Sequence, residues 1–168
     1  LVQRHLLPLE FQCDIFSMDL DFLYSEYLGV CSSLGLNLAD HLLIASVAHQ
    51  RINYFQYGKS DKAYVMSSSK NPPSCVEGSL GTPWGLHEVC EKIGEGEALG
   101  MVFAGRVPVG LRYWECDEGK RRDNLITTRI LRLRGLQSGV NSGGEVDTYN
   151  RYVYVHGTNH EDRLGSPS

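Results

Sequence analysis

The sequence predicts a mostly-β domain of the sandwich or barrel-like kind, with a short N-terminal helix. Three observations point to this fold class. The chain has 168 residues, which suffices for one domain with its own hydrophobic core. Its 18 glycines and 9 tyrosines favour short strands joined by tight turns. After Asn37, apolar and branched residues come in short runs separated by turn residues, and the helical spacing seen before it disappears.

The first 37 residues are predicted to be an irregular lead-in followed by one helix. Residues 1–18 show no periodicity. From position 19 the apolar residues recur at helical spacing, with Asp19 placed to cap the start of the helix and Gly35 to end it. The apolar positions are Leu20, Leu23, Tyr24, Tyr27, Cys31 and Leu34. We therefore expect a helix near residues 19–34 and a separate β domain over residues 38–168.

Residues 38–168 are predicted to be a series of strands. Alternating or continuous apolar runs, bounded by turn residues, indicate each of them. The expected strands are 41–48, 51–57, 63–67, 86–93, 125–133 and 151–156. A turn is expected over Gly58–Asp61, a loop at the two prolines that follow Asn71, a glycine-rich loop at 94–100 and a turn-rich connection at 135–144.

Charge and cysteine content exclude several classes of function. The formal net charge is −4 and the basic residues are spread out, which argues against nucleic acid as a partner. The five cysteines form no CxxC pair, so neither a zinc site nor a disulfide framework is expected. A metal held by His156 and His160 would need a helix, which Gly157 and its neighbours disfavour. We expect no cofactor, no metal and no obligatory protein partner.

The last predicted strand carries the most informative side chains. Alternation along 151–156 puts Arg151, Val153 and Val155 on one face, and Tyr152, Tyr154 and His156 on the other. The valines would then face the core, and His156 would end the strand on a tyrosine-lined face. Histidine is the usual proton-transfer residue near neutral pH. Judged by position alone, a surface histidine without a chemical role is the more common explanation.

A set of collinear motifs resembles the catalytic domain of L,D-transpeptidases of the YkuD type. The stretch from Tyr154 through His156-Gly157 to Leu164-Gly165-Ser166 resembles the approach to that family's active site. Gly81-Thr82-Pro83-Trp84-Gly85 is similar to its Thr-Pro-x-Gly turn. The segments Glu91–Gly94 with Gly100 and Gly105-Arg106, Gly143–Tyr149, and His41–Ser69 also resemble family segments. The resemblance extends from near His41 to the end of the chain and implies an L,D-transpeptidase-like fold for residues 38–168.

The resemblance implies a mechanism and a set of site residues. A cysteine thiolate would attack a peptidoglycan stem peptide, release its terminal D-residue and form a thioester, which an amine from a second stem resolves. His156 would be the general base, and the carbonyl of Gly157 would hold its imidazole in the required tautomer. Tyr154, Thr158 and Asn159 would contact the substrate. The partners would be peptidoglycan stem peptides, and the location the cell envelope or periplasm.

The chain departs from the family pattern at its end. The family's Ser-x-Gly-Cys stretch is expected immediately after Ser168, and no cysteine present follows a Ser-x-Gly. Cys116 lies among acidic residues, which oppose thiolate formation. We therefore expect a fragment at both ends that is inactive as it stands. Two alternatives stay open: a non-catalytic peptidoglycan-binding β domain of the same descent, and an L,D-carboxypeptidase-type hydrolase in which water resolves the thioester.

Overall fold

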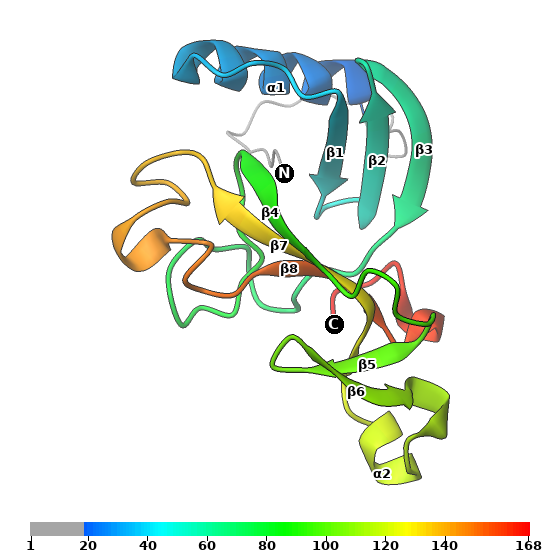
Figure 1. The fold of residues 1–168 in the computed structure, drawn as a ribbon. Coiled ribbons are helices and arrows are strands. Elements are labelled where there is room, and N and C mark those ends of the chain that lie inside the picture. Colours follow the sequence, from blue (N-terminus) through cyan, green and yellow to red (C-terminus); the bar gives the residue numbers. More distant parts are fainter. Residues whose placement is uncertain (1–18) are drawn as a thin grey trace.

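The computed structural model describes residues 19–168, and these residues form two antiparallel sheets with little helix (Figure 1). The predicted mostly-β class is confirmed. The strands are β1 (His41–Ser46), β2 (Arg51–Gln56), β3 (Lys59–Val65), β4 (His87–Ile93), β5 (Met101–Ala104), β6 (Val107–Arg112), β7 (Ile126–Gly135) and β8 (Tyr154–Thr158). The helices are α1 (Leu20–Leu34) and α2 (Glu118–Arg121), with 3-10 turns at Tyr113–Glu115, Gly144–Val146 and Glu161–Arg163. The predicted lead-in over residues 1–18, with Cys13, lies outside the described residues.

Helix α1 begins and ends where the sequence predicts. The Asp19 carboxylate accepts a hydrogen bond from the backbone N–H of Phe22 at 2.8 Å, which satisfies an amide that the helix itself leaves free. Gly35 adopts a left-handed conformation with φ of 63°, and the N–H of Leu36 then donates to the carbonyl of Cys31 at 2.9 Å. This is the glycine-ended helix terminus that avoids the steric cost of a Cβ at positive φ.

Helix α1 packs across the first sheet and reaches the second. The ring of Tyr24 stacks on Phe55 of β2 with 5.2 Å between centroids. Tyr27 and Cys31 are buried together with Leu86, the residue just before β4. Figure 1 shows the helix lying over the ends of β1 to β3. Burial of this apolar face therefore ties the two sheets to one another.

The first sheet has the strand order β1-β2-β3, with adjacent strands joined by short turns. The sequence placed a turn over Gly58–Asp61, but β3 already begins at Lys59, which pairs with Gln56. Tyr57 and Gly58 have φ of 48° and 75°, so the connection is a two-residue hairpin turn with both central residues at positive φ. All seven residues of β3 are exposed, as expected for an edge strand.

The second sheet is organised around β7. Ile126 pairs with Phe103 of β5 and with Thr158 of β8, and Ile130 pairs with Ile93 of β4 and with His156 of β8. Because a strand has two edges, β8 runs along one edge of β7, while β5 and then β4 occupy the other. Thr128, with φ of 67°, lies at the register shift that separates the two halves. The sheet positions β8 next to its longest strand.

Besides the earlier start of β3, two unpredicted strands and the start of β8 differ from the prediction. β5 and β6 were not predicted; they form a hairpin in which Ala104 pairs with Val107 and only Gly105 and Arg106 lie between. The last strand starts at Tyr154 and not at Arg151, and continues to Thr158. Arg151 and Tyr152 lie in a turn whose N–H groups donate to Asp147 and Tyr149 at 3.1 Å each, and Tyr152 has φ of 55°. The predicted alternation of faces therefore does not extend back to Arg151 and Tyr152.

Within residues 19–168, no helix combines the length and the apolar character needed to cross a membrane.

Candidate functional site

A large open cleft lies between the two sheets, with a volume of about 1240 Å³. Leu43, Ala45 and Ile52 line it from the first sheet, and Leu133 and Val155 line it from β7 and β8. Polar residues also line it, among them His156, Thr158, His160, Glu161, Asp162 and Arg163 of β8 and the segment that follows. The cleft thus combines an apolar wall with many polar groups, which could serve as contacts for a polar ligand.

His156 lies in this cleft as an exposed residue in the middle of β8. Its Nδ1 is 2.8 Å from the carbonyl oxygen of Gly157. A carbonyl only accepts hydrogen bonds, so Nδ1 must carry a proton in this contact, and in the neutral ring Nε2 then carries the lone pair. No hydrogen bond to Nε2 is found among the residues that the structure describes. The imidazole is therefore oriented by the backbone and presents an available basic nitrogen.

Gly157 packs closely against β7, which leaves little room for a side chain at this position of β8. A Cβ atom at this position would lie 2.7 Å from the carbonyl oxygen of Thr127 and 3.1 Å from the Cβ of Thr128. Both contacts are tighter than side chains tolerate, and the nearer one involves backbone that cannot rotate away. Glycine is thus required sterically beside the bulge of β7, and its carbonyl is free to hold His156.

The three residues predicted to contact substrate have different surroundings. The hydroxyl of Tyr154 accepts a hydrogen bond from Arg106 at 3.0 Å. The hydroxyl of Thr158 accepts the N–H of His160 at 3.1 Å and also lines the cleft. The amide of Asn159 is engaged with the loop before β7, since it accepts from Leu125 N at 2.9 Å and donates to the carbonyls of Arg121 and Asp123. Their role in substrate binding stays a prediction.

Arginine and tyrosine side chains gather beside His156 in what we call the arginine–tyrosine cluster, defined as Arg106, Arg132, Tyr149, Tyr152, Tyr154 and Glu91. Arg132, buried in β7, pairs with Glu91 of β4 at 2.9 Å and lies 3.5 Å from the centroid of the Tyr149 ring. The Tyr149 hydroxyl donates to the same carboxylate at 2.8 Å, and this hydrogen bond lowers the pKa of Glu91. The cluster is a set of cation–π and charge-assisted contacts on the face of the sheet that carries Tyr154.

Arg106 enters the cluster from the tip of the β5–β6 hairpin. It lies over the Tyr152 ring at 4.7 Å, and Arg132 lies 4.8 Å from the same ring. Its hydrogen bond to Tyr154 raises the pKa of the guanidinium. Arg106 was noted in the sequence only within a segment that resembles the family, and its place at a hairpin tip was not predicted because β5 and β6 were not recognised. A Gly-Arg pair between the apolar runs Met101–Ala104 and Val107–Leu111 was the available signal.

His87, at the start of β4, resembles His156 in one contact and differs in its surroundings. Its Nδ1 is 3.0 Å from the carbonyl of Gly85, and its Nε2 is 3.0 Å from the hydroxyl of Thr148, a residue with no exposed surface. Burial lowers its pKa from 6.5 to about 4, because a charged imidazole would lose its hydration there. His87 is thus a neutral structural histidine with both ring nitrogens occupied.

The four described cysteines take no part in the cleft. Cys31, Cys75 and Cys116 are buried and Cys90 is partly buried. The thiols of Cys75, Cys90 and Cys116 each contact a backbone carbonyl, at 3.7, 3.3 and 3.7 Å. None of the four is among the residues that line the cleft with His156.

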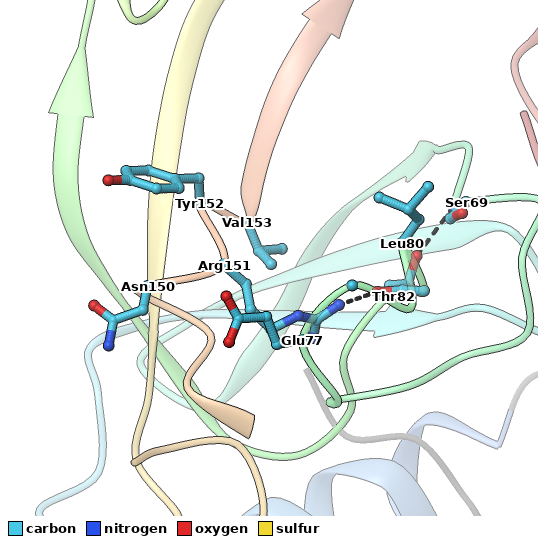
Figure 2. Close-up of a pocket in the computed structure, with 10 residues that line it drawn as sticks. Ser69, Glu77, Leu80, Thr82, Asn150, Arg151, Tyr152 and Val153 are labelled. Carbon is cyan, nitrogen blue, oxygen red and sulfur yellow. Dashed lines mark hydrogen bonds between the residues drawn. The ribbon is translucent and has the colours of Figure 1, made fainter. Parts of the chain in front are cut away.

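A second, smaller pocket of about 470 Å³ lies beside Arg151, and Figure 2 shows its lining. The guanidinium of Arg151 points at the loop that carries Leu80 and Thr82, whereas the Tyr152 ring points the opposite way. Arg151 donates to the carbonyls of Ser74 and Gly81 at 3.0 and 2.8 Å and to the Ser79 hydroxyl at 3.3 Å. Because these acceptors occupy the guanidinium, Arg151 is a structural tie for the loop. Alternation predicted that Arg151 shares a face with Val153 and Val155, and this prediction is wrong because Arg151 lies in a turn before β8.

No match to the chain was found among protein-family models, curated proteins or solved structures. The site therefore has to be judged from its geometry. Within residues 19–168, no group of three or more His, Cys, Asp or Glu side chains is placed to hold a metal ion. What the geometry does offer is a cleft, an oriented imidazole and a neighbouring arginine–tyrosine cluster.

Proposed function

We propose that residues 38–168 belong to the catalytic domain of a peptidoglycan L,D-transpeptidase in the cell envelope, with His156 as its general base. The observation that carries this proposal is the hydrogen bond from Nδ1 of His156 to the Gly157 carbonyl at 2.8 Å, with Nε2 left available in an open cleft. Sequence resemblance assigns the same two residues the same roles. The volume of the cleft, about 1240 Å³, and its apolar wall suit the binding of a peptide.

In the proposed reaction, Nε2 of His156 accepts the proton of a cysteine thiol, and the thiolate attacks a carbonyl of the donor stem peptide. The C–N bond to the terminal D-residue breaks, the imidazolium protonates the leaving amine, and a thioester is left. The amine of a second stem then attacks the thioester and gives its proton to Nε2. The new amide forms as the C–S bond breaks, and the cysteine leaves as a thiolate that the imidazolium reprotonates. The Gly157 carbonyl keeps Nδ1 protonated throughout, so that Nε2 is the nitrogen that exchanges protons.

A peptidoglycan-binding domain without catalysis is the second candidate. The observation that favours it is that none of the four described cysteines lines the cleft or has the exposure that a nucleophile needs. In this case the cleft and the arginine–tyrosine cluster would bind stem peptides, and His156 would be one of the contacts.

A mass measurement separates the two candidates. The protein expressed from its complete gene is incubated with a carbapenem, which acylates the cysteine of L,D-transpeptidases, and intact mass is recorded. The transpeptidase predicts one covalent adduct per protein and release of D-alanine from a tetrapeptide stem. The binding domain predicts an unchanged mass together with saturable binding of the same tetrapeptide. Absence of both the adduct and the binding would refute both candidates.

A further inference from the structure

Three arginines lie on the face of the second sheet near Tyr154, and two of them are neutralised. Arg132 pairs with Glu91 and Arg134 pairs with Glu88, each at 2.9 Å. Arg106 has no carboxylate partner among residues 19–168; its partners are the Tyr154 hydroxyl and the Tyr152 ring. The cluster therefore holds one positive charge more than its own acidic groups balance.

The position of Arg106 is set by the backbone of the hairpin tip. Gly105 and Arg106 have φ of 55° and 71°, which gives the two-residue turn that matches strand twist. A non-glycine residue at this φ is strained, so the turn geometry by itself would favour glycine and does not account for an arginine here. One N–H group of Nη1 donates to Tyr154, and no hydrogen bond from Nη2 or Nε is found among residues 19–168. The three N–H groups on Nη2 and Nε are thus left for a ligand.

Arg106 is linked through the Tyr154 hydroxyl to the strand that carries the proposed base. Tyr154 and His156 are two residues apart on β8, so their side chains leave the same face of the strand roughly 7 Å apart. Arg132 contributes a further observation, because its Nε is buried and has no hydrogen-bond partner, although the residue is only 7% exposed. A buried donor of this kind adds positive potential to the cluster.

We propose that Arg106, held between Tyr152 and Tyr154, binds a carboxylate of the substrate peptide, about one residue away from the carbonyl that is attacked beside His156. This inference rests on the proposed function and adds a selectivity to it: peptides with a free side-chain carboxylate are preferred over their amidated counterparts. A guanidinium recognises a carboxylate through two parallel hydrogen bonds, whereas an amide supplies one acceptor and no charge. A hydrogen bond to a charged group contributes roughly 1.5–3 kcal/mol, equivalent to a preference of about 10- to 100-fold.

Calorimetric titration of the 168-residue chain with two matched peptides tests the inference. The first is L-Ala-γ-D-Glu-meso-diaminopimelyl-D-Ala with its side-chain carboxylate free, and the second is the same peptide with that carboxylate amidated. We expect the free acid to bind about 10- to 100-fold more tightly, and Arg106→Gln to reduce this ratio to about twofold. Arg112→Gln is the matched control, because it removes the same charge from the same hairpin, where the Arg112 guanidinium lies 5.7 Å from the centroid of the Trp114 ring, and it should keep the full ratio.

Arg106→Lys controls for misfolding, because lysine keeps the positive charge but lacks the planar pair of donors. We expect its preference for the free acid to lie between those of the wild type and of Arg106→Gln. Equal binding of both peptides by the wild type would overturn the carboxylate site and leave the proposed function standing. A ratio that survives Arg106→Gln would assign the selectivity to another residue and would likewise overturn it. Binding of neither peptide would refute the proposed function as well.

Discussion

His87 and His156 both place Nδ1 against a glycine carbonyl, but they differ in what surrounds Nε2. Each ring directs Nδ1 at a glycine carbonyl, of Gly85 at 3.0 Å and of Gly157 at 2.8 Å. The Nε2 of His87 is then 3.0 Å from the buried hydroxyl of Thr148, whereas no hydrogen bond to the Nε2 of His156 is found among residues 19–168, and His156 is one of the residues that line the open cleft. The comparison shows that fixing a tautomer does not by itself make a histidine reactive. What distinguishes the two residues is the environment of the second nitrogen.

The largest expected effect is on reaction rate, and it belongs to His156 alone. In the protein expressed from its complete gene, His156→Ala should lower the rate of carbapenem acylation by roughly two to four orders of magnitude. His160→Ala is the matched control, because His160 lines the same cleft but its Nε2 lies 3.1 Å from the Asp123 carbonyl and must donate to it. Stopped-flow fluorescence measures both rates. A His156→Ala variant that acylates at the wild-type rate would remove His156 from the mechanism.

The second prediction concerns stability, where the larger effect is expected for His87 and the smaller one for His156. His87→Ala should reduce the free energy of unfolding by about 2–4 kcal/mol, because it opens a cavity and leaves the Thr148 hydroxyl without its partner. His156→Ala, at an exposed position, should change it by less than about 0.5 kcal/mol. Urea denaturation followed by circular dichroism gives both values. If both variants lost the same free energy of unfolding, the assignment of His87 as structural and of His156 as non-structural would be wrong.

The third prediction concerns acid sensitivity. The pKa of His87 is about 4 in the folded protein and 6.5 in a free imidazole, so between these pH values the unfolded chain binds a proton that the folded chain does not. This contribution to stability is fully present above pH 6.5 and is lost as the pH falls towards 4, by up to ~3 kcal/mol. His87→Gln should flatten this part of the profile. Asp147, whose pKa is lowered by hydrogen bonds from the Asn150 and Gly143 N–H groups, acts below this window.

Measurement of unfolding in urea at several pH values between 4 and 7 checks the third prediction. A slope that persists unchanged in His87→Gln would show that another group takes up the proton.

The smallest expected effect concerns the glycine that holds His156. Gly157→Ala should cost about 1–3 kcal/mol of stability, since its Cβ would lie 2.7 Å from the Thr127 carbonyl oxygen. Gly29→Ala in α1 is a control of opposite sign: nothing lies within 4 Å of a Cβ there, and alanine should stabilise the helix by about 0.5–1 kcal/mol. Thermal unfolding ranks the three proteins. Equal stability of Gly157→Ala and the wild type would mean that β8 can move away from β7 at no cost.

Local chemistry predicted the first part of the molecule well. The bounds of α1 followed from Asp19 and Gly35, whose capping depends on neighbouring residues only. β1 and β2 were found because apolar residues cover their length. In contrast, β5 and β6 were missed, since Gly100, Gly105 and Gly110 interrupt the pattern and their pairing with each other and with β7 is a tertiary feature. The predicted start of β8 was wrong because the turn at Arg151 and Tyr152 depends on hydrogen bonds to Asp147 and Tyr149.

The candidate site was predicted in part. His156 and Gly157 were named in advance, and the predicted hydrogen bond between them is present. The approach of Arg106 to Tyr152 and Tyr154 could not be anticipated, because 46 residues or more separate the hairpin tip from the tyrosines, and only the sheet brings them together. Arg151 and Tyr152 point in opposite directions because Tyr152 has a positive φ, and a tyrosine in the sequence does not predict such a conformation.

The pairing around β7 has a consequence for the order in which the protein takes shape during synthesis. Residues 20–65 contain α1 and all partners of the first sheet, so this half can begin to pair as soon as it leaves the ribosome. β5 can pair locally with β6, but β4 must wait for β7, which follows it by more than thirty residues, and β7 has one open edge until β8 arrives. Until then the β4–β7 sheet presents unpaired backbone, and this is the interval in which a nascent chain is most exposed to aggregation.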